Sequence, residues 1–227
     1  MPKFILVRHG ESVWNSQRRI QGSLDPELSP RGRRQTDLLV SHLRAHLTPA
    51  VAAIVTSPLR RAAQTADQIA AAYRIPAVRE PDLREMSLGR WEGKTVAEIQ
   101  AAYPGCYERW LEDPLEFPAP GGEDLRAFER RVVAALERMR GARPGADLIL
   151  VSHGGVIKAL LCLALGLDVR YLFRLKQDNT AVNQIELDGR VRRVLLLNDT
   201  CHLNQGGQDL AARDVLTDAA DVAEPAF

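Results

Sequence analysis

Apolar residues gather in three short runs that are separated by longer stretches of mixed polarity. The runs cover residues 4–7, 53–55 and 148–151, and within each run the apolar character is continuous. Continuous apolar runs of this length are typical of strands buried on both faces, as in a mostly parallel sheet that is covered by helices. The pattern therefore predicts three inner strands of such a sheet.

Two later stretches, residues 181–187 and 192–198, have the composition of strands. They flank Asp188 and Gly189, a pair of residues that favours a tight turn between antiparallel strands. We expect this hairpin to close one edge of the sheet.

Between the runs, apolar residues recur every three or four positions, which is the spacing of an amphipathic helix. One helix is expected over residues 30–47, with Ser29 as its N-cap and Pro30 in the first helical position. Further helices are expected over residues 59–73, from Leu125 onward with one apolar stripe, and over residues 155–165.

This alternation of strands and helices predicts an α/β protein, a three-layer α/β/α sandwich whose mostly parallel sheet carries an antiparallel edge strand. We expect a single domain over residues 1–205. Within it, residues 86–122 are irregular and predict a lid-like segment, with a short helix capped by Thr95 and Glu98. Residues 206–227 are acidic and lack core signals, which predicts a flexible tail.

Composition narrows the classes of function. The formal net charge of +1 argues against nucleic acid as a partner, because binding the phosphate backbone needs a concentrated basic surface. No apolar stretch is long enough to span a membrane, so no membrane partner is expected. The first seven residues lack the basic flank and cleavage site of a signal peptide, which predicts a cytoplasmic protein.

Two of the predicted inner strands end in a histidine that is followed by glycine. His9 follows the first run and His153 follows the third. Ligands of open α/β sheets bind beyond the carboxyl ends of the strands, so these two histidines are expected to meet there. A single Arg-His-Gly or Ser-His-Gly sequence would mean little, but the pair at equivalent strand ends predicts a site.

Arginines accompany this pair of histidines. Arg8 precedes His9, and Arg60 and Arg61 open the helix that follows the middle strand. A guanidinium group binds phosphate oxygens through forked, charge-assisted hydrogen bonds, and a helix N-terminus adds backbone N–H donors. We expect Arg61 to reach the site, whereas Arg60 either joins it or remains in solvent. The combination predicts a phosphate-binding site.

Five motifs occur in one order along the chain. They are Arg8-His9-Gly10-Glu11 with Asn15, Gln21-Gly22 with Asp25 and Leu28, residues 57–66, Leu83-Arg84-Glu85 leading to Gly93, and Ser152-His153-Gly154-Gly155. Together they resemble the histidine phosphatase superfamily, also called phosphoglycerate mutase-like, over roughly residues 3–203.

The resemblance implies a mechanism and a set of roles. His9 is the nucleophile that becomes a phosphohistidine, and Arg8, Arg61 and a protonated His153 neutralise the phosphate oxygens. Glu85 protonates the leaving oxygen and then activates water. Nearby cations are expected to keep His9 neutral, while bound phosphate raises the pKa of His153. The resemblance also assigns substrate or phosphate binding to Asn15, Gln21, Gly22, Ser57 and Gly154.

The same active site serves two classes of enzyme. The expected function is a metal-independent phosphatase that hydrolyses small-molecule phosphomonoesters. The alternative is a cofactor-dependent phosphoglycerate mutase, but the longer arginine-paired insertion and the tyrosine after the acid that such mutases carry are not visible here. A non-catalytic phosphate-binding module would predict a broken set of motifs, whereas this set is complete. No cofactor is expected.

Other features leave choices open. The aromatic residues Trp91, Tyr107, Trp110 and Phe117 either line an apolar pocket for a leaving group or pack the lid. An edge strand offers a route to a homodimer.

Metal binding is not expected, since the chain lacks His-x-His and HExxH motifs. His42 and His46 share a helix face but have no third ligand in the sequence, so we interpret them as surface residues, and His202 receives no role. The cysteines show no CxxC spacing, which disfavours a disulfide framework or structural zinc site; they are Cys106, Cys162 and Cys201.

Overall fold

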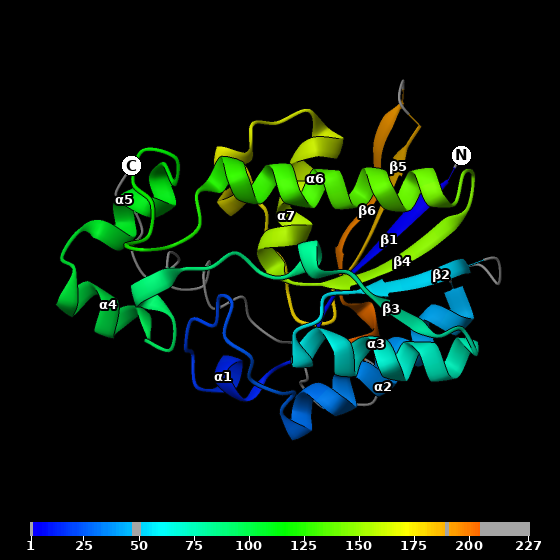
Figure 1. Cartoon of the computed structure of the whole chain (residues 1–227). Coiled ribbons are helices and arrows are strands. Elements are labelled where there is room, and N and C mark those ends of the chain that lie inside the picture. Colours follow the sequence, from blue (N-terminus) through cyan, green and yellow to red (C-terminus); the bar gives the residue numbers. More distant parts are fainter. Residues whose placement is uncertain (1, 47–50, 189–190, 205–227) are drawn as a thin grey trace.

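The computed structural model describes residues 2–46, 51–188 and 191–204. In this part of the chain six strands form one sheet in the order β3-β2-β4-β1-β5-β6 (Figure 1). The first four strands in this order run parallel, and β5 runs antiparallel to both of its neighbours. The strands are β1 (Lys3–Arg8), β2 (Val51–Thr56), β3 (Ala77–Arg79), β4 (Asp147–Ser152), β5 (Val182–Leu187) and β6 (Arg192–Asp199).

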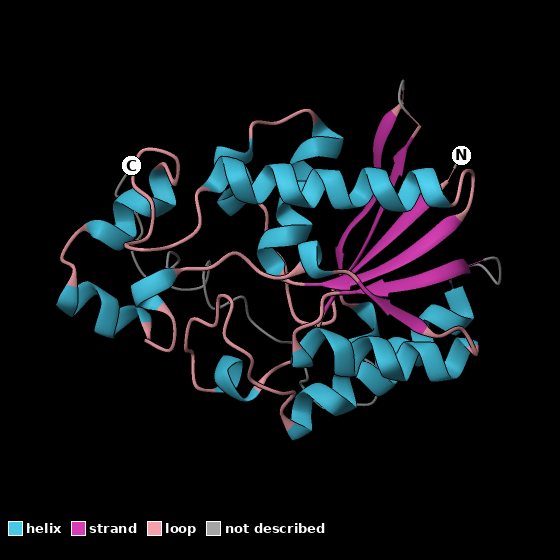
Figure 2. Cartoon of the chain, viewed as in Figure 1, coloured by secondary structure: helices cyan, strands magenta, loops and turns pink. Residues whose placement is uncertain are grey.

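Helices cover both faces of the sheet, as the apolar runs predict. Helices α2 (Pro30–His46) and α3 (Arg60–Tyr73) lie on one face, and α6 (Leu125–Ala142) and α7 (Gly154–Leu165) lie on the other (Figure 2). Successive residues of β1 point to opposite faces, so that Phe4 packs in the core under α6 and α7 while Ile5 packs in the core over α2 and α3. The predicted three-layer α/β/α sandwich is confirmed.

The local signals for helix starts are also confirmed. The Ser29 hydroxyl accepts a hydrogen bond from the Gly32 N–H at 2.9 Å, which caps the first turn of α2. Helix α4 (Val96–Ala102) begins with a capping box in which Thr95 and Glu98 each bind the other's backbone N–H. The hairpin of β5 and β6 is present, although Gly189 of its turn lies outside the described residues, as do Leu47 and the predicted tail over 206–227.

Several short elements have no clear sequence signal. Strand β3 has only three residues, of which the first is partly buried and the other two are exposed. It therefore lacks the apolar run that marks the inner strands. The short helices are too brief to show helical periodicity. They are α1 (Val13–Ser16) and α5 (Cys106–Glu112), with the 3₁₀ turns η1 (Pro81–Leu83), η2 (Gly89–Trp91), η3 (Val169–Arg174) and η4 (Cys201–Asn204).

The predicted lid segment contains α4 and α5 and lies beyond the end of the sheet to which β1 points (Figure 1). Its aromatic residues pack together. Trp91, Tyr107 and Trp110 are at most 2% exposed, and their ring centroids lie 5.4 to 5.9 Å apart. Phe117 instead lies under the Arg109 guanidinium, 3.7 Å from the ring centroid. Of the two interpretations, packing therefore describes Trp91 and Tyr107, whereas Trp110 both packs with these rings and lines a small pocket.

No helix within the described residues is both long and apolar enough to cross a membrane.

A close contact joins the segment after β1 to the start of α2. A Cβ atom added at Gly32 would lie 1.9 Å from the Glu11 carbonyl oxygen, and one added at Gly10 would lie 2.5 Å from the Gly32 carbonyl oxygen. Both distances are too short for any side chain. Glycine at these positions lets α2 begin directly against the segment that carries His9.

We predict that Gly32→Ala lowers the free energy of unfolding by about 1–3 kcal/mol, because the backbone must shift to admit the methyl group. Gly141→Ala is the matched control, since Gly141 is also helical and nothing lies within 4 Å of a Cβ there. This control is expected to be neutral or stabilising by up to about 1 kcal/mol. Urea unfolding of the two variants measures both effects, and equal stabilities would contradict the contact.

Candidate active site

The two strand-end histidines meet, as the sequence predicts. Strands β1 and β4 are parallel neighbours with Arg8 paired opposite Ser152, so the next residue of each strand is brought to the same edge. The ring centroids of His9 and His153 lie 5.2 Å apart with an interplanar angle of 61°. Both side chains are buried, at 2% and 0% exposure.

Hydrogen bonding orients the ring of His9. Its Nδ1 lies 2.7 Å from the Gly10 carbonyl oxygen, which can only accept, so Nδ1 carries the proton. In the neutral ring the lone pair is then on Nε2. Burial lowers the pKa of His9 well below its usual value, and the charges of Arg61 and Arg8 lower it further. His9 is therefore a neutral imidazole at neutral pH, with the lone pair on Nε2.

His153 is held by Ser57. The His153 Nε2 and the Ser57 hydroxyl oxygen lie 2.7 Å apart, and that hydroxyl also accepts the Leu59 N–H at 3.2 Å. Burial, followed by the charge of Arg61, lowers the pKa of His153 well below its usual value. In the free protein His153 is thus neutral, and the sequence interpretation expects its positive charge only with phosphate bound. That charge requires the bound phosphate dianion, which would oppose the effect of the arginines.

The two arginines lie beside the histidines. Arg61 is 1% exposed and donates to the Leu24 and Gly22 carbonyl oxygens at 2.7 and 2.9 Å, while its Nε has no hydrogen-bond partner within the described residues. Burial lowers the pKa of Arg61 to about 10, so it keeps its charge at neutral pH. Arg8 donates to the Gln177 carbonyl oxygen. Buried guanidinium groups around a neutral imidazole form an anion site.

The start of α3 decides between the two interpretations of Arg60. The Arg60 N–H donates to the Asp25 carboxylate at 2.5 Å, so this backbone donor is already bound to an anion of the chain itself. The Arg60 side chain is exposed and pairs with Glu27 at 2.9 Å. Helix α3 therefore reaches the site through the Arg61 side chain, while the N–H of its first residue is bound by Asp25.

Glu85 lies against the start of α7, which follows His153 directly. Its carboxylate accepts the Gly155 N–H at 3.1 Å and the Met86 N–H at 3.0 Å. The space is close, since a Cβ added at Gly155 would lie 2.5 Å from Glu85 Oε1. Neighbouring Gly154 lies against the Arg8 guanidinium, because a Cβ added there would be 3.7 Å from Arg8 Cζ. The Ser152-His153-Gly154-Gly155 motif thus positions the acid as well as the histidine.

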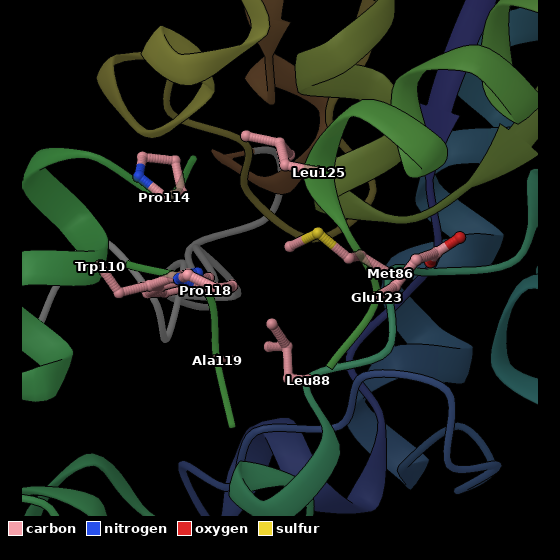
Figure 3. Close-up of a pocket in the computed structure, with 8 residues that line it drawn as sticks. All are labelled: Met86, Leu88, Trp110, Pro114, Pro118, Ala119, Glu123 and Leu125. Carbon is pink, nitrogen blue, oxygen red and sulfur yellow. The ribbon is translucent and has the colours of Figure 1, made fainter. Parts of the chain in front are cut away.

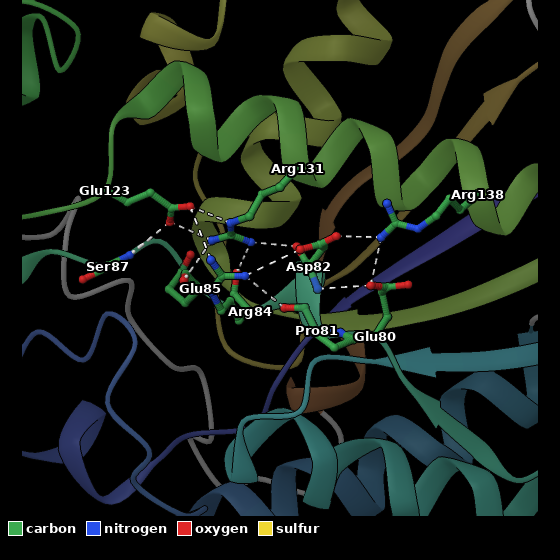
Figure 4. A network of polar contacts seen from close by, with 9 residues as sticks. All are labelled: Glu80, Pro81, Asp82, Arg84, Glu85, Ser87, Glu123, Arg131 and Arg138. Carbon is green, nitrogen blue, oxygen red and sulfur yellow. Dashed lines mark hydrogen bonds and ion pairs between the residues drawn. The ribbon is translucent and has the colours of Figure 1, made fainter.

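Arg131 of α6 holds the segment that carries Glu85 (Figure 4). Its guanidinium donates to the backbone carbonyl oxygens of Asp82, Arg84 and Glu85 at 2.7, 2.8 and 3.1 Å. It also forms a two-pronged ion pair with Glu123, with N–O distances of 2.6 and 2.8 Å. The sequence gives no signal for this role of Arg131, because the carbonyl groups that it binds lie 46 to 49 residues away along the chain.

The predicted binding residues near the N-terminus form one network. Ser12 donates from its backbone N–H to Asn15 Oδ1 at 3.1 Å and from its hydroxyl to Gln21 Oε1 at 2.7 Å. The Gly22 carbonyl oxygen binds Arg61. The structure therefore brings Asn15, Gln21 and Gly22 to the same side of the site as the arginines, and their contact with substrate stays a prediction.

Four consecutive polar residues before β5 belong to the site although sequence reasoning does not identify them. Gln177 provides the carbonyl oxygen for Arg8, and the Asn179 side chain and the Thr180 N–H both donate to the His9 carbonyl oxygen, each at 3.2 Å. Together they form a polar wall against the backbone of His9. A run of polar residues directly before a buried strand is the signal that could reveal them.

An apolar pocket lies where the lid meets α6 (Figure 3). It borders Met86, the residue after Glu85, and the Glu123 carboxylate on its rim is already paired with Arg131. The other residues that line it are Leu88, Trp110, Pro114, Pro118, Ala119 and Leu125.

A sequence profile described as "Histidine phosphatase superfamily (branch 1)" matches residues 4–200. The chain belongs to this superfamily. The predicted family is therefore confirmed.

The relatives of this histidine phosphatase include proteins named as phosphatases and proteins named as phosphoglycerate mutases. Phosphoserine phosphatase 1 of Hydrogenobacter thermophilus is 38% identical over 90% of this chain and 96% of its own length. A probable phosphoglycerate mutase of Yersinia enterocolitica is 33% identical over 82% of this chain and 85% of its own length. The structure of a mycobacterial glucosyl-3-phosphoglycerate phosphatase in complex with VO3 has a TM-score of 0.80 at 31% identity, covering 87% of this chain and 99% of that one.

The family and the phosphatases among these relatives identify the chain as a phosphomonoester hydrolase. A non-catalytic module is correspondingly excluded, and the five residues with expected catalytic roles lie together at one edge of the sheet.

We predict that Arg131→Ala lowers kcat for alkyl phosphates by about 10–100-fold, because Glu85 loses its fixed position. The loss should be smaller for nitrophenyl phosphate, whose leaving group needs no proton. Arg138→Ala is the matched control, since Arg138 is also on α6 and pairs with Glu80 and Asp82 of the same segment without touching Glu85. Steady-state kinetics with both substrates measure the effect. Equal losses in both variants would show a general structural role instead.

Proposed function

We propose that the protein hydrolyses small phosphomonoesters in two steps, through a phosphohistidine at His9 Nε2. The observation that carries this proposal is the buried ring of His9, whose Nδ1 donates to the Gly10 carbonyl oxygen and whose pKa is lowered by burial and by two arginines. Such a ring is neutral, and it presents its lone pair where a phosphate would be bound.

In the first step His9 Nε2 attacks phosphorus in line with the ester oxygen, so that the N–P bond forms as the P–O bond breaks. The leaving oxygen takes a proton from Glu85. Charge on the three remaining phosphate oxygens is neutralised by Arg8 and Arg61, and this positioning and neutralisation supply most of the catalysis in phosphoryl transfer. These charges come from side chains, so the proposal requires no metal ion.

In the second step a water molecule attacks the phosphohistidine. The Glu85 carboxylate takes the proton of that water, and orthophosphate leaves as neutral His9 is restored. His153 acts in both steps by donating a hydrogen bond to the phosphoryl group, and the negative charge of that group raises the pKa of His153 from its low value in the free protein.

We propose L-phosphoserine as the first substrate to test, since the relative from Hydrogenobacter thermophilus is named for it. The mutase alternative rests on the relative from Yersinia enterocolitica. Against it, the residues after Glu85 are Met86, Ser87 and Leu88, without a tyrosine, and the helices of the lid, α4 and α5, have seven residues each. Stimulation of phosphoglycerate interconversion by 2,3-bisphosphoglycerate would favour the mutase.

We predict that His9→Ala abolishes both phosphatase turnover and the trapped phosphoenzyme. The reaction is quenched rapidly with base, and ³¹P NMR then detects the phosphoenzyme, because the N–P bond of phosphohistidine is stable to base. His46→Ala replaces an exposed histidine and is the control, with full turnover expected. A phosphoenzyme that forms normally in His9→Ala would place the nucleophile elsewhere.

Glu85→Gln should slow hydrolysis of phosphoserine by about 10²–10⁴-fold, the usual contribution of a general acid or base. Formation of the phosphoenzyme from nitrophenyl phosphate should be slowed far less, because nitrophenolate leaves without a proton. Single-turnover kinetics with the two substrates separate the steps. If Glu85→Gln slows phosphoenzyme formation from both substrates equally, Glu85 is not the proton donor.

A further inference from the structure

A second cluster of ionisable side chains lies outside the candidate active site, where α2 meets the end of β6 and the segment that follows it. His42 of α2, Asp199 at the end of β6 and Cys201 of η4 are brought together from three elements. His42 Nε2 lies 3.5 Å from Asp199 Oδ2, and Cys201 Sγ lies 3.6 Å from the same oxygen. Cys201 Sγ also lies 3.7 Å from His42 Nδ1. The structure thereby corrects the sequence interpretation of His42 as a surface residue, since it is 9% exposed.

A single ion would bind only one nitrogen of His42, so the 3.5 Å contact at Nε2 and the 3.7 Å contact at Nδ1 are not both ligand–ligand distances of one site. With metal–ligand bonds of roughly 2.0–2.3 Å, the ligands of a tetrahedral ion lie about 3.3–3.8 Å apart. One ligand atom from each of the three residues lies within 4.8 Å of the other two. Small rotations of the three side chains would therefore bring one ligand atom of each within bonding distance of a single ion.

His202 supplies an independent observation. Its Nε2 lies 3.0 Å from the Thr180 hydroxyl, which donates its own proton to the Asn179 carbonyl oxygen at 2.7 Å. The hydroxyl must then accept from His202 Nε2–H, so the lone pair of His202 is on Nδ1. That atom is buried without a hydrogen-bond partner among the described residues, in a side chain that is 1% exposed. A buried lone pair without a donor is costly unless a cation takes it up.

The ring of His202 is adjacent to the cluster. Its centroid lies 5.4 Å from that of His42, and its neighbour in sequence is Cys201. His202 is not among the residues whose ligand atoms lie within 4.8 Å of one another, so its ring must shift before Nδ1 can become a fourth ligand.

We propose that His42, Asp199 and Cys201 bind one transition-metal ion of the Zn²⁺ type, with His202 completing the site. Imidazole and thiolate donors exclude Mg²⁺ and Ca²⁺ as preferred ions, because these take oxygen ligands. The Cys201 thiol loses its proton when the S–metal bond forms, so affinity rises with pH.

The proposed ion is structural and takes no part in phosphoryl transfer. It joins α2 to the segment after β6. A single residue, Thr180, connects that segment to His9. Thr180 contacts His202 by its hydroxyl and donates its N–H to the His9 carbonyl oxygen at 3.2 Å. An ion at this position would brace the wall behind His9.

The test uses the full chain after removal of metal by a chelator. Titration with Co²⁺ should saturate at one ion per chain and produce the near-ultraviolet charge-transfer band of a Co²⁺–thiolate bond. Cys201→Ser should lose this band. Cys106→Ser is the matched control, because Cys106 is the other exposed cysteine and lies in the lid; it should keep the band.

Zn²⁺ provides a second readout. Calorimetric titration should show that His42→Gln and Asp199→Asn each weaken Zn²⁺ binding by more than about tenfold. Zn²⁺ should also raise the melting temperature of the wild type and of Cys106→Ser, but not of Cys201→Ser. Phosphatase activity in chelator should be the same in Cys201→Ser as in the wild type, so this test is independent of the proposed function.

Three results would overturn the proposal. The first is an absence of saturable binding of either ion, and the second is a cobalt band that survives in Cys201→Ser. The third concerns His46, which is exposed and whose ring centroid lies 4.8 Å from that of His42. If His46→Gln abolishes binding while Asp199→Asn retains it, the ion is held by the histidine pair of α2 and not by the proposed ligands.

Discussion

The site depends on positive charge that is buried beside neutral imidazole rings. Arg61 and Arg8 are buried and both donate to backbone carbonyl oxygens, while the nearby carboxylates of Glu85 and Asp25 act on Arg61 in the direction that favours its charge. Burial, and after it the charge of the two arginines, hold the pKa of both histidines well below the usual value. In the proposed mechanism these groups are already in place, so little reorganisation is needed when a phosphate binds.

Holding these charges in place requires support from most of the fold. The register of β1 against β4 brings the two histidines to one edge, and α7 begins there with the Gly155 N–H that binds Glu85. From the other side, Arg131 of α6 fixes the backbone of the acid. The polar residues before β5 close the site behind His9. The catalytic geometry is therefore a property of the joined strand ends and of the helices that start at them.

Much of this arrangement could be predicted from the sequence because its signals are local. Continuous apolar runs mark buried strands, Ser29 and Thr95 mark helix starts, and the motifs around His9 and His153 lie where those strands end. Arg131 and Gln177 carry no such signal, since their roles come from contacts with residues distant in the chain. The interpretation of His42 as a surface residue is wrong for the same reason, because only the return of the chain after β6 buries it.

The aromatic rings of the lid have a bearing on how substrates enter. Trp91, Tyr107 and Trp110 belong to the same continuous core as Phe128 of α6, so the segment is attached to the body of the protein by buried apolar surface. Swinging it outward would expose these rings at about 2–3 kcal/mol each. This cost disfavours a hinged opening of the segment, so we expect substrates to be limited in size by the space that the attached segment leaves.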